Sequence, residues 1–247
     1  MYNHHMLYIK DNFKNIKFII DNALFQLPPK EQEEADKLWL KRRKESDLLY
    51  NGWPYSCKNI TFEGSGMMSF DIVRIEYKTY IWARETKADI KGFYPIGVMV
   101  VIYDPVNKVY VMARRSKKVA FSKNDICLIG GVLEHKGNVL QKEFPNFILN
   151  TAYKEVSEEL ITKQELKLEN FKQIGLYIDQ EKFRLNFLIY CKIKEPKLRN
   201  DENKTLLHVK PKDLNNFLQS HKKEIDKVAY YHLYSNLPEL SSLQFKS

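Results

Sequence analysis

Apolar residues in the middle of the chain fall into short runs separated by turn residues, which is the pattern of β-strands. Residues 94–103 (YPIGVMVVIY) form one such run, a turn containing Pro105 and Asn107 follows, and residues 109–113 form a second run. A shorter run at residues 126–129 ends in Gly130-Gly131. The pattern predicts a hairpin, a short strand and a diglycine turn whose backbone a ligand or metal can approach closely.

The pattern then changes to a helical period over residues 152–160 (AYKEVSEEL). One stripe of the predicted helix is apolar and consists of Ala152, Val156 and Leu160. Three carboxylates share another face at positions i, i+3 and i+4, namely Glu155, Glu158 and Glu159. Like charges this close favour a compensating cation, and hard oxygen ligands suit Mg²⁺ or Mn²⁺. The alternative is a solvated acidic helix face without a metal.

This order of parts resembles the Nudix hydrolase superfamily. The segment 154–159 (KEVSEE) is similar to the helical core of the family signature, and Gly131 stands where that signature opens. The resemblance implies an α/β fold, namely a Nudix-like α/β/α sandwich with a mixed sheet. It also implies hydrolysis, with Mg²⁺ or Mn²⁺ as cofactor, of a nucleoside diphosphate linked to another moiety. By the same resemblance the metal ligands and catalytic groups are Glu155, Glu158 and Glu159, with Gly131 as a further ligand through its carbonyl.

The basic residues nearest this motif are the expected phosphate contacts, namely Arg114, Arg115 and Lys154. The general base is expected to be one of the helix glutamates, or Asp179 or Glu181 in a predicted hairpin turn. The hairpin itself is predicted from residues 172–177 and 183–193.

Several features depart from the family pattern. Lys154 stands 23 positions after Gly131 where the signature has 14, so nine residues are inserted. The first glutamate of the signature has only Glu134 and Glu143 as candidates, and its last glycine is absent. Lys154 also replaces an arginine and loses the planar guanidinium fork. A Nudix fold that binds a nucleotide without cleaving it is therefore an open alternative.

The chain is predicted to divide near residue 93, into an N-terminal helix with a small antiparallel sheet (residues 1–93) and a Nudix-like hydrolase domain (residues 94–247). Pro28-Pro29 predicts a helix over residues 30–46. Strands are expected at residues 58–62, 67–77 and 80–83. Beyond the hairpin, the pattern predicts a strand at residues 205–209 and helices at 214–221 and 225–234, the first capped by Asp213.

Aromatic residues of the N-terminal part are candidates for stacking on a base or for the core, namely Trp53, Tyr55, Tyr77, Tyr80 and Trp82. The segments 50–52 and 77–80 are similar to the UDP-glucose/UDP-galactose pyrophosphatase branch of the superfamily. The expected substrate is therefore a nucleotide-sugar, for example a UDP-sugar, or a related nucleoside diphosphate derivative.

Composition restricts the expected ligands of the protein and its expected location in the cell. The 247 residues carry a formal charge of +9 and are 44% hydrophobic. The positive charge favours an anionic small molecule and leaves capped RNA or a dinucleoside polyphosphate as an alternative substrate. The three cysteines are too few and too scattered for a disulfide framework, and no apolar run is long enough to span a membrane. A cytoplasmic enzyme is expected, and the oligomeric state is not predicted.

Overall fold

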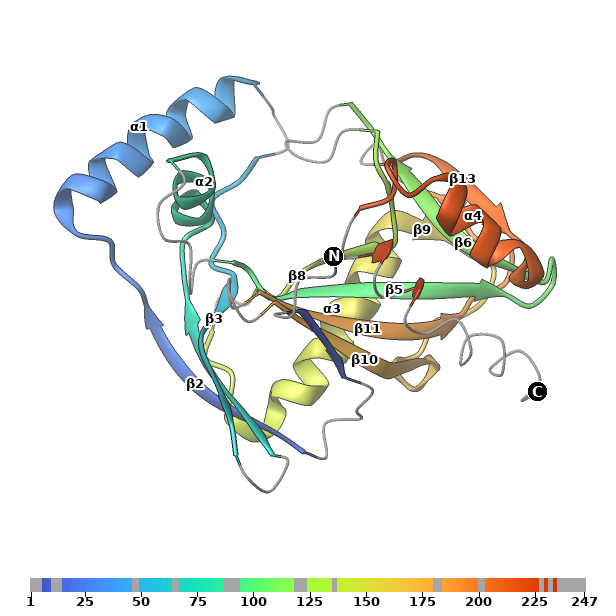
Figure 1. Cartoon of the computed structure of the whole chain (residues 1–247), viewed down its shortest axis with the longest axis horizontal. Coiled ribbons are helices and arrows are strands. Elements are labelled where there is room, and N and C mark those ends of the chain that lie inside the picture. The colour runs from blue at the N-terminus through green and yellow to red at the C-terminus, as the bar shows by residue number, and fades with distance from the viewer. Residues whose placement is uncertain are drawn as a thin grey trace.

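The computed structural model describes residues 6–9, 15–45, 49–63, 67–86, 94–117, 124–134, 137–179, 184–199, 203–226, 229–230 and 233–234. These residues form an α/β fold built around an eight-stranded mixed sheet (Figure 1). The main strand order is β1-β10-β11-β5-β6-β13, and these strands are β1 (Met6–Ile9), β10 (Phe171–Asp179), β11 (Arg184–Lys192), β5 (Gly97–Asp104), β6 (Val109–Arg115) and β13 (Asn203–Val209). Two short strands join at one side, β7 (Ile126–Cys127) on β6 and β8 (Ile129–Val132) on β5.

The predicted hairpins and the mixed character of this sheet are confirmed. β5 pairs antiparallel with β6 and with β8, and β10 pairs antiparallel with β11. β11 pairs parallel with β5, which places two strands distant in sequence side by side at the centre of the sheet. The expected strand at residues 205–209 is part of β13.

Helices cover both faces of the sheet because side chains of its strands alternate between two cores. In β5, Val98, Val100 and Ile102 face the core formed with α3 (Phe144–Glu159). Val101 and Tyr103 face the opposite core, which contains Leu214 and Leu218 of α4 (Leu214–Ser220). The alternation of side chains along this one strand between the two cores therefore accounts for the α/β/α layering.

The acidic helix ends one residue earlier than the sequence predicts. Ala152 and Val156 are fully buried on α3, but Leu160 is extended and begins β9 (Leu160–Ile161), which pairs with β12 (Lys197–Leu198). Leu160 is still buried, so it packs into the same core from a strand.

The N-terminal part combines α1 (Pro29–Glu45), which has the predicted proline at its first position, with a three-stranded sheet. This sheet contains β2 (Ile16–Leu24), β4 (Met68–Arg74) and β3 (Tyr55–Phe62). The prediction of a purely antiparallel sheet is wrong, because β2 pairs parallel with β4 while β3 pairs antiparallel with it. The strand β2 was not predicted.

The strand predicted at residues 80–83 is also wrong, because the segment forms α2 (Tyr77–Thr86). Its buried side chains include Ile81, Trp82 and Ala83, and they pack against α1. Figure 1 shows α1 and α2 together at one end of the molecule, with α4 at the other end. Adjacent buried positions suit a helix wedged between two neighbours better than a strand with one buried face.

The small sheet and the central sheet share one hydrophobic core. Phe18 of β2 and Tyr55 of β3 contact Phe144 of α3, with ring centroids 4.8 Å and 5.8 Å apart. β1, from the start of the chain, pairs antiparallel with β10 of the central sheet. The division near residue 93 stays a prediction, and the packing across it is continuous.

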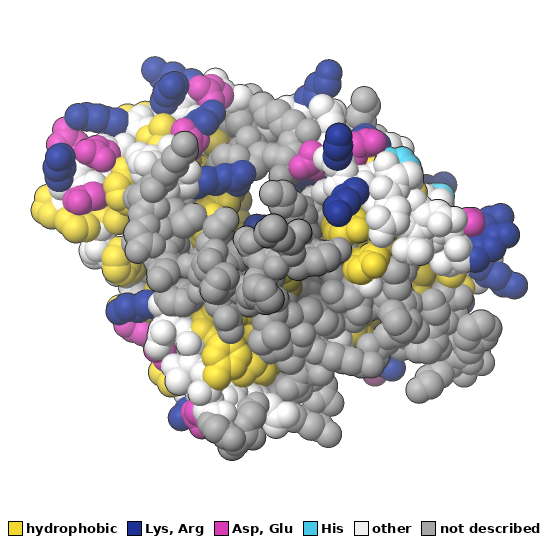
Figure 2. Space-filling model, in the orientation of Figure 1, with side chains coloured by type: hydrophobic (Ala, Val, Ile, Leu, Met, Phe, Trp, Pro, Cys, Tyr) yellow, Lys and Arg dark blue, Asp and Glu magenta, His cyan; other side chains and the backbone are white. Residues whose placement is uncertain are grey.

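Charged side chains of both signs alternate over the surface around α1 (Figure 2). Lys37, for example, pairs with Glu33 at 2.6 Å on this helix. No helix among the described residues is long and apolar enough to cross a membrane. All three cysteines are buried and free, as expected.

Candidate active site

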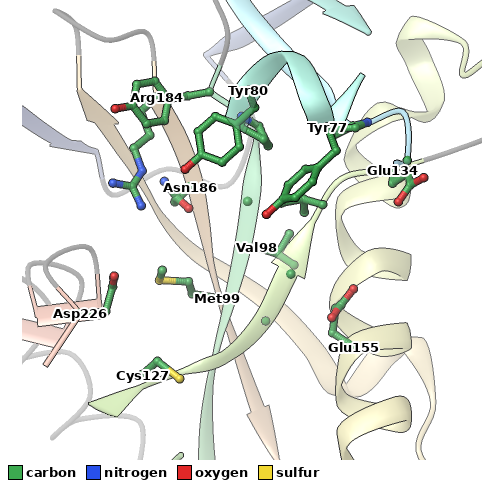
Figure 3. Close-up of a pocket in the computed structure, with 18 of the residues that line it drawn as sticks. Tyr77, Tyr80, Val98, Met99, Cys127, Glu134, Glu155, Arg184, Asn186 and Asp226 are labelled. Atoms are coloured by element: carbon green, nitrogen blue, oxygen red, sulfur yellow. The ribbon is translucent and has the colours of Figure 1, made fainter. Parts of the chain in front are cut away.

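A cavity of about 340 Å³ lies where the N-terminal part meets the central sheet. Its walls come from the segment that follows α1, from α2, from the starts of β5 and β11, from β7 and β8, and from α3. Figure 3 shows the labelled groups, with Glu134 and Glu155 on one side, Arg184 and Asp226 on the other, and Tyr77, Tyr80 and Asn186 between them. The cavity is thus acidic on the α3 side, and its opposite end carries both the guanidinium group of Arg184 and the carboxylate of Asp226.

The prediction of a turn at Gly130-Gly131 is wrong, because both glycines lie within the strand β8, where they line the cavity. A β-carbon built on Gly131 would fall 2.3 Å from Cδ of Glu155, so the Glu155 carboxylate occupies the space a side chain would need. A β-carbon on Gly130 would fall 2.1 Å from the backbone oxygen of Val98. The close approach expected at the diglycine is therefore made by Glu155 at Gly131 and by β5 at Gly130.

The three helix glutamates have different surroundings. Glu155 lines the cavity. Glu158 is exposed, and its carboxylate lies 3.8 Å from Nζ of Lys154. Glu159 is only 5% exposed, at the last position of α3. Among the described residues no three His, Cys, Asp or Glu side chains are grouped so that they could hold a metal ion.

A divalent ion that serves phosphate chemistry does not require three carboxylates. Mg²⁺ is commonly held by one or two carboxylates, with substrate phosphates and water as its other ligands. Glu155 at the cavity wall, beside the backbone of β8, provides oxygen donors of this kind. The residues present therefore fit a substrate-bridged Mg²⁺ or Mn²⁺ better than an ion held by protein groups alone.

Glu134 is one of the two candidates for the first glutamate of the sequence motif. Its carboxylate holds the segment 50–53 in place through two hydrogen bonds. Its Oε1 accepts a hydrogen bond from the Trp53 backbone N–H at 3.0 Å, and its Oε2 accepts one from the Tyr50 hydroxyl at 2.5 Å. A β-carbon on Gly52 would fall 2.1 Å from the same carboxylate. Burial, and then the hydrogen bond to Glu134, raise the pKa of Tyr50, so its hydroxyl stays a donor.

Of the three predicted phosphate contacts, only Arg115 lines the cavity. Arg114 donates to the Asn124 backbone oxygen and to Glu224, both at 2.9 Å. The Lys154 side chain is 61% exposed on α3. Neither Arg114 nor Lys154 belongs to the described lining of the cavity.

Two lining arginines were not anticipated, and tyrosines orient both. Arg84 donates a hydrogen bond to the Tyr80 hydroxyl at 3.0 Å. The Arg184 guanidinium lies over the Tyr94 ring, 5.7 Å from its centroid. Tyr80 and Arg84 are four residues apart, a spacing that brings two side chains together on a helix. The pair could have been found in the sequence only if residues 77–86 had been predicted as a helix.

Tyrosine rings form the wall that faces the sheet. Tyr77 and Tyr80 have ring centroids 5.7 Å apart, and Tyr80 and Tyr94 have theirs 5.6 Å apart. Burial raises the pKa of Tyr77 to about 12, so its hydroxyl is neutral at ordinary pH. Of the five aromatic residues singled out from the sequence, Tyr77 and Tyr80 line the cavity, whereas Tyr55 and Trp82 are buried in cores.

The remaining candidates for a general base cannot be placed in the cavity. Glu181 and the side chain of Asp179 lie outside the described residues. Asp226 lines the cavity, and its Oδ1 accepts a hydrogen bond from the Ala229 backbone N–H at 3.2 Å.

No protein-family model matches this sequence, and no curated protein matches it. Among solved structures, a NUDIX hydrolase from Alicyclobacillus acidocaldarius is similar over 59% of this chain and 91% of its own, with 15% identity and a TM-score of 0.44. A bifunctional NMN adenylyltransferase/ADP ribose pyrophosphatase from Francisella tularensis, in complex with AMP and a Mn ion, is similar over 66% of this chain and 46% of its own. Its identity is 16% and its TM-score 0.45. A MutT protein from Methanosarcina mazei Go1 covers 60% of this chain and 95% of its own, with 14% identity and a TM-score of 0.39.

Proposed function

We propose that this chain is a metal-dependent pyrophosphate hydrolase of the Nudix type, which cleaves a nucleoside diphosphate linked to another moiety. The observation that carries the proposal is the contact between the Glu155 carboxylate and Gly131 in the cavity wall. It joins the two parts of the sequence motif, the diglycine and the acidic helix, at one place. A UDP-sugar is the first substrate to test, and Mg²⁺ or Mn²⁺ is the proposed cofactor.

The rest of the cavity suits such a ligand. Tyr77, Tyr80 and Tyr94 offer ring faces on which a base can stack. Arg84, Arg115 and Arg184 give the cavity positive charge for an anionic ligand, and guanidinium groups match phosphate geometry with two parallel hydrogen bonds. A site with both flat apolar surfaces and several arginines favours a nucleotide over an uncharged or purely apolar ligand.

In the proposed mechanism Glu155 and the backbone oxygen of Gly131 would hold the divalent ion, with Glu158 and Glu159 as further candidate ligands. When bound, such an ion would polarise a phosphoryl oxygen and lower the pKa of a bound water. Arg115 neutralises charge on the diphosphate. Glu134 fixes the position of the segment 50–53 through Tyr50 and the Trp53 backbone, and so keeps the cavity wall in place. The proton of the attacking water would go to a carboxylate, either one of the helix glutamates or Asp179 or Glu181.

A second candidate function is nucleotide binding without cleavage. It is favoured by the different surroundings of the three glutamates, because Glu158 is exposed beside Lys154 while Glu159 is buried. Hydrolysis of capped RNA or of a dinucleoside polyphosphate is a third possibility, and it differs from the main proposal only in the substrate.

The test is a substrate panel run on the full chain with Mg²⁺ and with Mn²⁺. It contains UDP-glucose, UDP-galactose, a diadenosine polyphosphate and a capped RNA, and release of nucleoside monophosphate is measured. We expect turnover of a UDP-sugar, reduced at least about 10²-fold in Glu155→Gln, Glu158→Gln and Glu159→Gln. Glu165→Gln is the matched control, because its carboxylate is 83% exposed and pairs only loosely with Lys167, at 3.9 Å.

The outcomes separate the candidates. Turnover of capped RNA alone would move the assignment to that substrate. If no substrate releases monophosphate while nucleotide binding persists, the chain binds without cleaving. If Glu155→Gln keeps full turnover in a folded protein, the assignment of the site to this cavity is wrong.

A further inference from the structure

Asn186 is an isolated polar residue in an otherwise apolar stretch of β11. Its neighbours from Leu185 to Leu188 are fully buried, and Asn186 itself is only 5% exposed. Its amide nitrogen Nδ2 is buried and has no hydrogen-bond partner. Leaving a buried amide unpaired costs stability, so such a group in a cavity wall is commonly retained for a ligand.

The sheet register places this amide on the cavity wall. Asn186 pairs with Gly97 across the parallel β11–β5 contact. A β-carbon on Gly97 would fall 2.4 Å from Oδ1 of Asn186, so the amide lies in the space that the glycine leaves open. Both residues line the cavity, and Figure 3 shows Asn186 between Arg184 and the tyrosines.

We propose that Asn186 recognises the base of the nucleotide by hydrogen-bonding the polar edge of a pyrimidine ring. The inference rests on the proposed function, since it identifies the ring end of the same ligand. An amide carries a donor and an acceptor side by side, and each pyrimidine base presents a complementary pair on its edge, N–H and carbonyl in uracil, amino group and ring nitrogen in cytosine. Two hydrogen bonds then form between the amide and the ring, while Tyr77 and Tyr80 contact the ring face.

Two features of the site suit a pyrimidine base at Asn186. The cavity volume of about 340 Å³ must also hold a diphosphate and a second moiety, and a pyrimidine leaves more of this space than a purine. Nδ2 of Asn186 is shielded from solvent in this structure. Rotation about the Cβ–Cγ bond turns it toward the ring without moving the backbone. The acidic side at Glu155 is then left for the diphosphate.

The experiment measures binding rather than turnover. Dissociation constants of UDP, CDP and inorganic pyrophosphate, which has no base, are determined by titration calorimetry on the full chain with and without Mg²⁺, for the wild type, Asn186→Asp and Asn186→Ala. In Asn186→Asp a carboxylate oxygen replaces the amide donor and faces an acceptor on either base, the uracil 4-carbonyl or the cytosine N3. We therefore expect UDP and CDP each to bind at least about tenfold more weakly. Asn186→Ala removes the amide without adding charge, so it should weaken both nucleotides and leave pyrophosphate binding unchanged.

The controls keep the result interpretable. Asn215→Asp makes the same chemical change on an exposed position of α4, outside the cavity lining, and should leave these dissociation constants unchanged. Thermal melting checks that each variant is folded. If Asn186→Asp does not fold, Gly97→Ala replaces it, because the new methyl group displaces the amide without adding charge.

Three results would overturn the inference: unchanged UDP binding in a folded Asn186→Ala protein, an equal loss of pyrophosphate binding in that variant, or no binding of UDP by the wild type with or without Mg²⁺. The failure of the proposed function has a different signature. If UDP binding depends on Asn186 but no nucleotide is hydrolysed, the hydrolase assignment fails and the base-recognition role stands. If a UDP-sugar is hydrolysed and the Asn186 variants bind as the wild type does, only the base-recognition role fails.

Discussion

The contact between Gly131 and Glu155 makes Gly131→Ala a sensitive test of the site. A β-carbon at Gly131 would lie 2.3 Å from Cδ of Glu155 and 2.4 Å from each carboxylate oxygen. An ordinary contact starts near 3.4 Å, so the carboxylate must move by about 1 Å. A misplacement of that size in a catalytic site can reduce turnover about 10²-fold. We therefore expect kcat for a UDP-sugar to fall about 10²-fold in Gly131→Ala.

The stability of this variant should change little. The clash falls on the end of a flexible side chain, and an off-rotamer side chain costs about 0.5–1.5 kcal/mol. For a chain of this size that lowers the melting temperature by only a few degrees. Gly130→Ala is the contrasting variant, because its β-carbon would meet the backbone oxygen of Val98, which cannot move without disturbing β5. It should be strongly destabilised.

A double-mutant cycle identifies the cause. If Gly131→Ala acts only by displacing Glu155, it should have almost no further effect on kcat in a Glu155→Gln background. Monophosphate release and thermal melting are measured for the two single variants and the double variant. Full turnover in a folded Gly131→Ala protein would refute the reasoning, and so would additive losses in the cycle.

Three further predictions concern the fold. Phe144→Ala should lower the free energy of unfolding by about 3–5 kcal/mol in denaturant titration, because the ring is fully buried between Phe18 and Tyr55. Burial raises the pKa of Cys127 to about 12, from a usual value of 9.0, so iodoacetamide should alkylate this thiol quickly only after unfolding, as mass spectrometry would detect. Burial likewise raises the pKa of Tyr77 from 10.0 to about 12, so the folded state keeps a proton that the unfolded state has lost. The unfolding free energy should therefore fall as pH rises from 10 to 12, and a Tyr77→Phe variant should show a smaller fall.

Local patterns in the sequence were sufficient for four strands of the central sheet and for the C-terminal half of α3. The runs that became β5, β6, β10 and β11 are apolar and of strand length, and turn residues separate them. The 3.6-residue spacing of Ala152 and Val156 fixed which face of α3 is buried. Such periodicity is a property of the chain itself, because each side of an element meets a different solvent or core.

Local patterns failed where burial surrounds an element on more than one side. In α2, Ile81, Trp82 and Ala83 are consecutive and buried, so the segment has strand-like apolar density although it forms a helix. β2 is rich in apolar residues, but it lies at the edge of its sheet, where Phe18 is buried in the core and the adjacent Ile19 is exposed. In both cases the neighbouring elements, which are distant in sequence, determine the outcome.

The candidate site shows the same difference between what local patterns predict and what tertiary packing decides. The order of the diglycine and the acidic helix along the chain, together with its resemblance to the Nudix signature, brought Gly131 and Glu155 into one hypothesis. The choice among the three glutamates depended on which way α3 faces, and the inclusion of Arg84, Arg184 and Asn186 depended on strand register and on the docking of α2. Spacing along the sequence specifies chemistry within one element, whereas a cavity assembled from separate elements exists only after they have packed together.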